Sequence, residues 1–208
     1  MDPWTDPDEP PPALGVVLDD DRGSLPYSLV HGEALVAAAA WALGEAGVTL
    51  VDATVEWAGF VEAAEPLVLH DSLCPLTPPD FIAACVRRAV WTDAVVVGVR
   101  AVTDTVKDLE PDDAGVDPGS GQGGAWVGAT VDRDALVTVC SPLVLPASRV
   151  AALDGLPTTD LAALVDLLAA GGEVIREAAP ATARRVAGPD DVRLLEALTR
   201  PERPTLPA

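Results

Sequence analysis

A carboxylate at the end of an apolar run is the first feature of this sequence that could do chemistry. Residues 67–70 read Leu-Val-Leu-His, which predicts a buried strand, and Asp71 follows just before a turn and a helical pattern over residues 78–90. In an open α/β sheet, ligands bind just beyond the carboxyl ends of the strands. Asp71 could therefore face a substrate, or its side chain could only cap the turn.

Cys74 and His70 suggest a second kind of chemistry, because a cysteine–histidine pair can be nucleophilic. His70 ends the strand and Cys74 follows the turn, so no helix geometry sets the distance between them. A free cysteine is usually a small buried hydrophobe, and we favour that interpretation. The chain has 3 cysteines, none in a CxxC pair, and 2 histidines. This pattern indicates reduced thiols and predicts no metal site.

The charge balance limits the ligands that the protein can take. The sequence contains 33 acidic and 13 basic residues, for a net charge of −20, and Lys107 is the single lysine. Binding to nucleic acid requires basic groups that neutralise phosphates, so we expect no nucleic acid partner. The same charge disfavours small anions unless arginines act locally. No apolar run is long enough to span a membrane, and the N-terminus lacks the features of a signal peptide, so we expect a cytoplasmic protein without a membrane partner.

Strand-like and helix-like segments alternate, which predicts an α/β fold with a mostly parallel sheet flanked by helices. We expect the helix after residue 160 to be capped by Thr158 or Thr159. The expected strands are residues 13–18, 48–51, 67–70, 93–99 and 173–176, and the expected helices are residues 33–45, 54–64, 78–90, 146–153, 160–170 and 189–198.

A change in amino-acid composition interrupts this alternation of strands and helices. Residues 108–124 are acidic and glycine-rich, and such a stretch cannot bury a core, so we expect a mobile loop. Strand-like segments at residues 126–131 and 136–139 follow it. We expect residues 101–139 to form a protruding β-arm within a single domain over residues 13–200, between a disordered acidic, proline-rich N-terminus (residues 1–12) and a tail (residues 201–208).

Several short motifs occur in an order that is typical of one enzyme family. They are Leu69-His70-Asp71 with Pro75, Thr103-Asp104-Thr105-Val106-Lys107, Thr130-Val131-Asp132-Arg133, Ser141-Pro142, Thr158-Thr159-Asp160 followed by Gly171-Gly172, and Arg185-Val186 with Pro189-Asp190-Asp191. In these motifs the chain resembles the 2-C-methyl-D-erythritol 4-phosphate cytidylyltransferases of isoprenoid precursor synthesis.

The resemblance implies a Rossmann-like nucleotidyltransferase fold with a β-arm that forms a homodimer. It implies a reaction in which a phosphate oxygen of the substrate attacks the α-phosphate of CTP, with Mg²⁺ present. The residues that match the family's substrate-binding motif positions, and that the resemblance therefore implies bind a polyol phosphate, are Asp71, Thr105, Lys107, Arg133 and Ser141. The resemblance also implies that Thr105 and Arg133 reach the active site of the partner subunit.

The nucleotide half of the expected site departs from the family pattern. The family's glycine-rich phosphate loop is replaced by the acidic residues 19–21, and Tyr27 stands where a lysine follows the proline. Three carboxylates would repel a triphosphate at close range. Cys74 stands where the family has an arginine, and Arg185 stands where the family has a catalytic lysine. The family's segment that contacts cytidine has no counterpart in this sequence.

Two functions remain open from the sequence. The chain could be a divergent cytidylyltransferase in which Arg22 and Arg185 act on phosphate and Mg²⁺ is the cofactor. It could instead be a non-catalytic paralogue that serves as a ligand-sensing or partner subunit. For Arg22 we favour a surface ion pair over phosphate binding.

Overall fold

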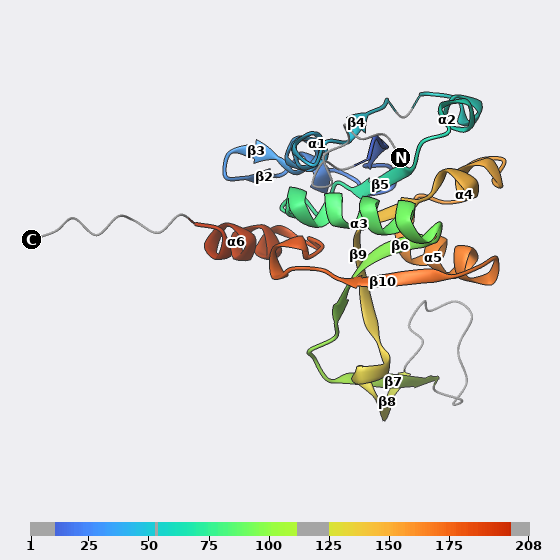
Figure 1. Ribbon diagram of the computed structural model, residues 1–208. Coiled ribbons are helices and arrows are strands. Elements are labelled where there is room, and N and C mark those ends of the chain that lie inside the picture. Colours follow the sequence, from blue (N-terminus) through green and yellow to red (C-terminus); the bar gives the residue numbers. More distant parts are fainter. Residues whose placement is uncertain (1–10, 53, 112–124, 201–208) are drawn as a thin grey trace, which may run out of the picture. The chain divides into compact units, whose positions relative to one another are not determined.

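The computed structural model describes residues 11–52, 54–111 and 125–200, and Figure 1 shows the elements they form. The chain divides into two compact units, one of residues 1–100 and 139–208 and the other of residues 101–138. The predicted N-terminal segment, the 201–208 tail and most of the predicted glycine-rich loop lie outside the described residues. In the described part of the chain, no helix has the length and hydrophobicity to span a bilayer.

The first unit is built on a six-stranded sheet with the order β10-β6-β9-β5-β1-β4. Strand β1 pairs in parallel with β4 and β5, and β10 pairs in parallel with β6, whereas β9 is antiparallel to β5. The predicted α/β fold with a mostly parallel sheet is confirmed. The strands are β1 (Leu14–Leu18), β4 (Thr49–Leu50), β5 (Leu67–Asp71), β6 (Val95–Ala101), β9 (Val137–Leu145) and β10 (Val174–Ala178).

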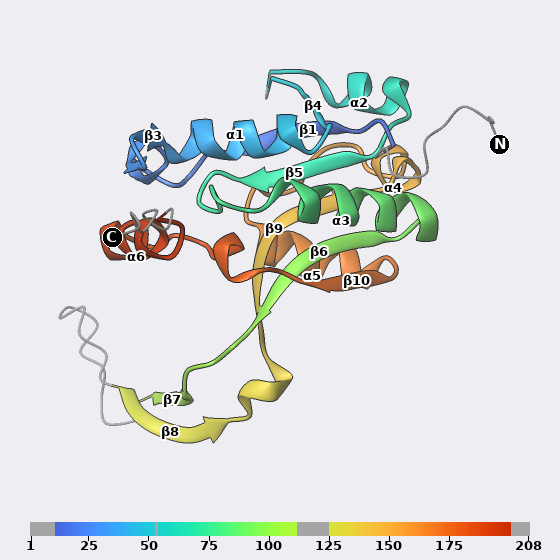
Figure 2. The same cartoon turned by 60° about the vertical axis from the view of Figure 1, so that its left-hand side comes forward.

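Helices cover both faces of this sheet (Figure 2). On one face, α1 (Leu35–Glu45) and α3 (Pro79–Thr92) form a core cluster with Val68, Val96 and Val144 of the strands. The other face carries α2 (Trp57–Ala63), α4 (Ala147–Ala151) and α5 (Leu161–Ala170), whose apolar side chains pack against Leu69 and Val97. Strands that are buried on both faces explain the continuous apolar runs in the sequence.

A third cluster joins the C-terminal helix α6 (Pro189–Leu198) to the start of α1 and to a small hairpin of β2 (Leu29–Val30) and β3 (Glu33–Ala34). The prediction for α6 is confirmed, with Pro189 in the first turn followed by two acidic residues. Short 3₁₀ turns lie at η1 (Leu25–Tyr27), η2 (Arg133–Ala135) and η3 (Ala181–Ala183).

Two local predictions were wrong for identifiable reasons. Helix α5 is capped by Asp160, whose carboxylate accepts from the N–H groups of Ala162 and Ala163 at 2.8 and 3.1 Å. The threonines were expected to cap it, but a carboxylate one residue later fits the N-cap equally well. Strand β9 runs from Val137 to Leu145, whereas the expected strand ended at residue 139. Gly98 of β6 lies against it, since a Cβ at Gly98 would be 2.9 Å from the Ser141 carbonyl oxygen.

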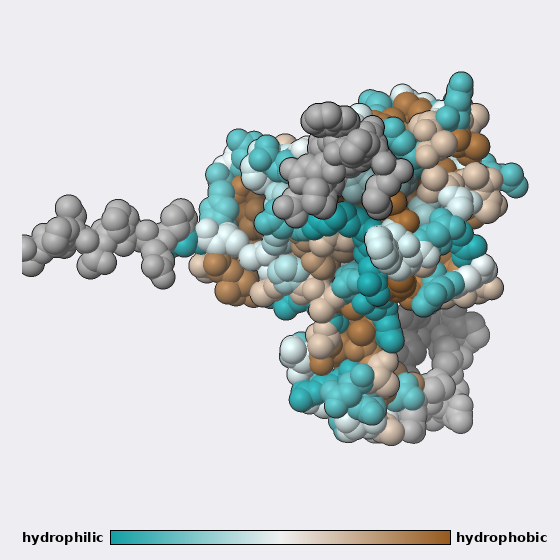
Figure 3. Space-filling view, in the orientation of Figure 1, coloured by the Kyte–Doolittle hydropathy of each residue, from teal (hydrophilic) through white to brown (hydrophobic). Residues whose placement is uncertain are grey.

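The second unit is a hairpin of β7 (Val106–Pro111) and β8 (Ala125–Val131), which pair antiparallel with an irregularity between Lys107 and Leu109. Asp108 therefore belongs to a strand, although it was expected in the loop. Leu109, Trp126 and Val127 are exposed on this hairpin. Figure 3 shows hydrophobic as well as hydrophilic residues on its surface.

Candidate functional site

Asp71 is the last residue of β5 and is buried. Its Oδ1 accepts hydrogen bonds from Arg22 Nε at 2.8 Å and from the Leu73 backbone N–H at 2.9 Å. Its Oδ2 accepts from Arg185 Nε at 2.9 Å and from Arg22 Nη2 at 3.3 Å. The carboxylate therefore caps the turn, as one interpretation expected, and also joins two guanidinium groups. Both oxygens are occupied by the protein itself.

Arg22 reaches Asp71 from the loop after β1, where Asp21 and Gly23 both have positive φ. Besides its bonds to Asp71, its Nη2 donates to the Thr159 carbonyl at 2.9 Å and its Nη1 to the Asp20 carbonyl. These contacts use four of the five N–H groups of the guanidinium. The side chain is 6% exposed, so the ion pair forms inside the protein and not at its surface as expected.

Arg185 is held beside Asp71 by its neighbours in the chain. The Val186 N–H donates to the Leu73 carbonyl at 2.7 Å, which ties this segment to the turn after β5. Asp191 of α6 accepts from Arg184 at 3.0 Å and from the Ala187 N–H at 2.8 Å. The Arg185 side chain remains 41% exposed. Of the two arginines, Arg185 is the one whose outer edge faces solvent.

Ser141 lies on β9, next to the end of β5. Its Oγ accepts from the Asp71 backbone N–H at 2.6 Å, and the residue is fully buried. The structure thus brings Asp71, Ser141, Arg22 and Arg185 together. In this arrangement Ser141 fixes the end of β5, where the carboxyl ends of β1 and β5 meet.

The ionisation of Asp71 follows from these contacts. Burial raises the pKa of its carboxyl, but hydrogen bonds from Arg22, from the Leu73 N–H and from Arg185 outweigh burial and hold the pKa below its usual value. Asp71 is therefore ionised at neutral pH and cancels one of the two arginine charges. The loop that carries Arg22 also contains the carboxylates of residues 19–21. The net charge of the side chains around the site is therefore negative, which opposes the binding of a polyanion.

Cys74 and His70 are both buried next to this site. Burial strongly raises the pKa of the Cys74 thiol, so it is a thiol and not a thiolate at neutral pH. Burial also lowers the pKa of His70 to about 4. Neither His70 ring nitrogen has a hydrogen-bond partner among the described residues. These properties match the predicted buried hydrophobe and oppose a nucleophilic pair.

The other predicted site residues lie on the hairpin unit. Thr105 and Arg133 line a small hollow there, together with Thr130 and Asp132. Arg133 Nη1 donates to the Thr103 carbonyl at 2.6 Å, and Lys107 Nζ donates to Thr130 Oγ1 at 2.6 Å. These three predicted residues lie close together within this unit.

Two of the contacts that sequence reasoning missed are made by backbone carbonyls. The Thr159 and Leu73 carbonyls hold Arg22 and the Arg185 segment in place. A main-chain oxygen carries no side-chain signature, so residue type gave no signal for either contact.

The sheet order and the helices on both faces of the sheet define the Rossmann-like fold of the nucleotidyltransferases. The crystal structure of 2-C-methyl-D-erythritol 4-phosphate cytidylyltransferase from Thermus thermophilus superimposes with a TM-score of 0.61 at 22% identity, over 89% of this chain and 98% of that one. No model of a protein family matches the sequence.

Relatives in sequence carry the same name. The 2-C-methyl-D-erythritol 4-phosphate cytidylyltransferase of Corynebacterium glutamicum (strain R) is 30% identical over 199 residues, which cover 91% of this chain and 69% of that protein. The protein of that name from Acidobacterium capsulatum is 30% identical over 148 residues, 68% of this chain and 55% of the other. The chain belongs to the 2-C-methyl-D-erythritol 4-phosphate cytidylyltransferase family.

Magnesium is the metal that the family implies, and the Asp71 carboxylate is not free to hold it. A protein-bound Mg²⁺ needs carboxylate oxygens with free lone pairs, whereas both oxygens of Asp71 accept from cations and a backbone N–H. Elsewhere in the described residues, no group of three or more His, Cys, Asp or Glu is placed to hold a metal.

Proposed function

We propose that this chain is a family member that has weakened or lost CMP transfer from CTP and serves as a ligand-sensing or partner subunit. One observation carries the proposal: the Asp71 carboxylate lies between Arg22 and Arg185 and accepts from both. A phosphate would have to displace a buried carboxylate that already has ideal hydrogen-bond distances. That exchange is costly, because breaking a buried ion pair leaves an uncompensated charge.

The acidic loop supports the same proposal. Asp20 and Asp21 are exposed in the loop that carries Arg22, where the family pattern has glycines and a following lysine. The Arg22 guanidinium already donates hydrogen bonds to the Asp71 carboxylate and to the Thr159 and Asp20 carbonyls. Arg22 is therefore not available to neutralise a triphosphate, and the exposed carboxylates around it oppose one.

The hairpin unit supports a homodimer that binds a small polyol phosphate. Leu109, Trp126 and Val127 are 66%, 67% and 72% exposed, and exposed apolar residues on a two-stranded hairpin suit a partner subunit. Arg133 and Thr105 on the same unit offer a cation and a hydroxyl for a phosphate and its polyol. We propose that they reach the Asp71 site of the partner chain.

A titration with CTP tests the proposal. We expect calorimetry with CTP and Mg²⁺ at low salt to give a dissociation constant no tighter than about 1 mM, or roughly −4 kcal/mol. We expect no release of pyrophosphate from CTP plus methylerythritol phosphate near the typical enzymatic rate of about 1 per second. The T. thermophilus protein, assayed in parallel, is the positive control. Micromolar CTP affinity or turnover at that rate would refute the proposal.

One observation favours residual catalysis as a second candidate function. Arg185 uses Nε for Asp71 and keeps its side chain 41% exposed, so its outer N–H groups could take a phosphate oxygen. A divergent transferase acting on another nucleotide would need this group. Slow pyrophosphate release that disappears in Arg185→Met would support this candidate.

A further inference from the structure

The C-terminal half of α3 presents an exposed aromatic ring beside two cations. It forms part of a groove between α3 and β10 that encloses about 580 Å³ and is lined by Phe81, Ala84, Cys85, Arg87, Arg88, Trp91, Glu177 and Ala178. Phe81 packs against the chain's own core, whereas Trp91 is 86% exposed. Arg87 and Arg88 precede Trp91 by four and three residues, so the three side chains are neighbours on the helix surface.

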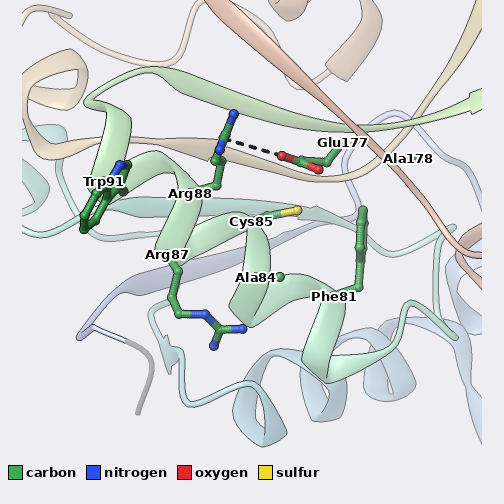
Figure 4. A pocket seen from close by; sticks show the side chains of 8 residues that line it. All are labelled: Phe81, Ala84, Cys85, Arg87, Arg88, Trp91, Glu177 and Ala178. Carbon is green, nitrogen blue, oxygen red and sulfur yellow. Dashed lines mark ion pairs between the residues drawn. The ribbon is translucent and has the colours of Figure 1, made fainter. Parts of the chain in front are cut away.

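The two arginines of this groove are incompletely neutralised. Arg88 Nε lies 3.7 Å from Glu177 Oε1, with side chains 52% and 38% exposed, and such a pair contributes little. Arg87 is exposed, and Figure 4 shows its side chain directed away from Glu177. No described residue forms an ion pair with Arg87. The groove thus has one positive charge in excess, in a chain of net charge −20, and it suits a negatively charged occupant.

Residues 1–10, which lie outside the described residues, have a composition that this surface fits. Their sequence is Met-Asp-Pro-Trp-Thr-Asp-Pro-Asp-Glu-Pro, with four carboxylates, three prolines and no basic side chain. Carboxylates pair with guanidinium groups, and proline-rich segments bind to surfaces lined by aromatic side chains. The opposite end of the chain, residues 201–208, is also rich in proline but has one acidic and one basic residue, so it lacks the complementary charge.

The start of the described chain lies on the same face of the sheet as α3. Ala13 is buried in the core cluster that α1 and α3 form on this face. Helix α3 leads into β6, and Figure 2 shows its last turn on the side of the sheet where the described chain begins. Strands β1 and β6 are separated by β5 and β9, so they lie about 14 Å apart at three strand spacings. Residues 6–9, which carry three of the four carboxylates, precede Ala13 by four to seven positions. That is about 13–23 Å of extended chain, which is enough to reach the two arginines.

We propose that the acidic, proline-rich residues 1–10 bind to the C-terminal half of α3 in the same chain, with carboxylates on Arg87 and Arg88 and a proline ring on Trp91. A short tether gives an effective concentration of about millimolar, so a contact that is weak between separate molecules is populated within one. The bound segment covers an apolar ring beside β10, the edge strand of the sheet, and so protects that edge from association. This interaction is independent of the proposed function.

Paramagnetic broadening of a nuclear magnetic resonance signal in the full-length chain tests this contact. Thr5→Cys provides a single reactive site for a nitroxide spin label, because the three native cysteines are buried. The signal is the indole N–H resonance of Trp91, which is assigned by its loss in Trp91→Phe. We expect the label to broaden this signal at about 0.01 M salt. We expect the intensity to recover at least about twofold at 1 M salt, where the Debye length falls to about 3 Å.

Charge reversal on both sides of the contact identifies its partners. Arg87→Glu/Arg88→Glu should restore the Trp91 signal of the labelled chain at low salt, because the carboxylates of the segment then face like charges. Adding Asp8→Arg/Glu9→Arg to these changes returns the net charge to its original value and places opposite charges across the contact again. We expect the broadening to return in this fourfold variant.

Arg193→Glu/Arg200→Glu is the matched control. It changes the net charge by the same amount, in α6 and just after it, and should leave the broadening as it is. A mixture of spin-labelled chain with isotope-labelled chain that has no spin label should show no broadening, because the segment binds its own molecule. The proposal is overturned by equal broadening in the control and the variant with reversed α3 arginines, by no return of broadening in the fourfold variant, or by broadening in the mixture.

Discussion

Arg22 Nε lies 2.8 Å from Asp71 Oδ1, and both side chains are almost fully buried. The residues are 49 positions apart in the sequence, and their contact fastens the loop after β1 to the end of β5. The Arg22 bond to the Thr159 carbonyl extends this link to the segment before α5. A buried ion pair thus stands where three connecting segments of the first unit meet.

Removal of the Arg22 charge should destabilise the fold. We expect Arg22→Met, which keeps most of the apolar stem, to lower the free energy of unfolding by about 3 kcal/mol, because Asp71 loses one of its two cations while remaining buried. Urea denaturation followed by circular dichroism measures this change. Arg193→Met is the control, since Arg193 pairs with Asp190 at the surface, and should leave the curve unchanged. Equal curves for both variants would contradict a structural role for Arg22.

Asp71→Asn should release the arginines to an external anion. The neutral amide keeps the shape of the side chain but no longer cancels a guanidinium charge. We therefore expect inorganic pyrophosphate to bind at least about tenfold more tightly, a gain of roughly 1.4 kcal/mol, as measured by calorimetry. Asp190→Asn makes the same change in net charge at the surface and should leave the affinity unaltered. If both variants bind alike, the carboxylate is not what keeps anions out.

His70 should make stability fall in mild acid. Its pKa is lowered from 6.5 to about 4 by burial, so between these values the unfolded chain binds more protons than the folded one. Stability is therefore fully present above pH 6.5 and is lost as the pH falls toward 4, by up to about 3 kcal/mol. His70→Leu should remove this part of the pH dependence and lose little at neutral pH, because neither ring nitrogen has a partner among the described residues. Thermal melts from pH 7 to 4.5 for both proteins make the comparison, and parallel profiles would contradict the assignment.

Arg133→Ala should abolish binding of methylerythritol phosphate while leaving the oligomeric state unchanged. The guanidinium is exposed and donates to the Thr103 carbonyl, so its loss removes a phosphate donor without removing core packing. Calorimetry at low salt gives the affinity, and light scattering gives the mass. Arg193→Ala removes one positive charge elsewhere and should bind like the unmodified protein. Retained affinity in Arg133→Ala would refute the role given to the hairpin.

The sequence predicted the elements of this fold better than the contacts between them. The bounds of α6 follow from Pro189 and the acidic residues after it, and the buried strands follow from their apolar runs. The predicted site residues in the first unit lie together, but their pairing was missed, because Arg185 and Asp71 are 114 residues apart. Local pattern carries no information on such a contact. The full length of β9 was also missed, since the strand expected to end at residue 139 continues to Leu145.

The hairpin unit enters and leaves the sheet through neighbouring strands. It follows β6 and precedes β9, which lie next to each other in the sheet, and Gly98 on one strand contacts Ser141 on the other. Residues 101–138 are thus an insertion in the connection between two neighbouring strands, and a short turn from Arg100 to Val139 would join the same two strands. We therefore expect a chain in which such a turn replaces residues 101–138 to keep the six-stranded sheet of the first unit.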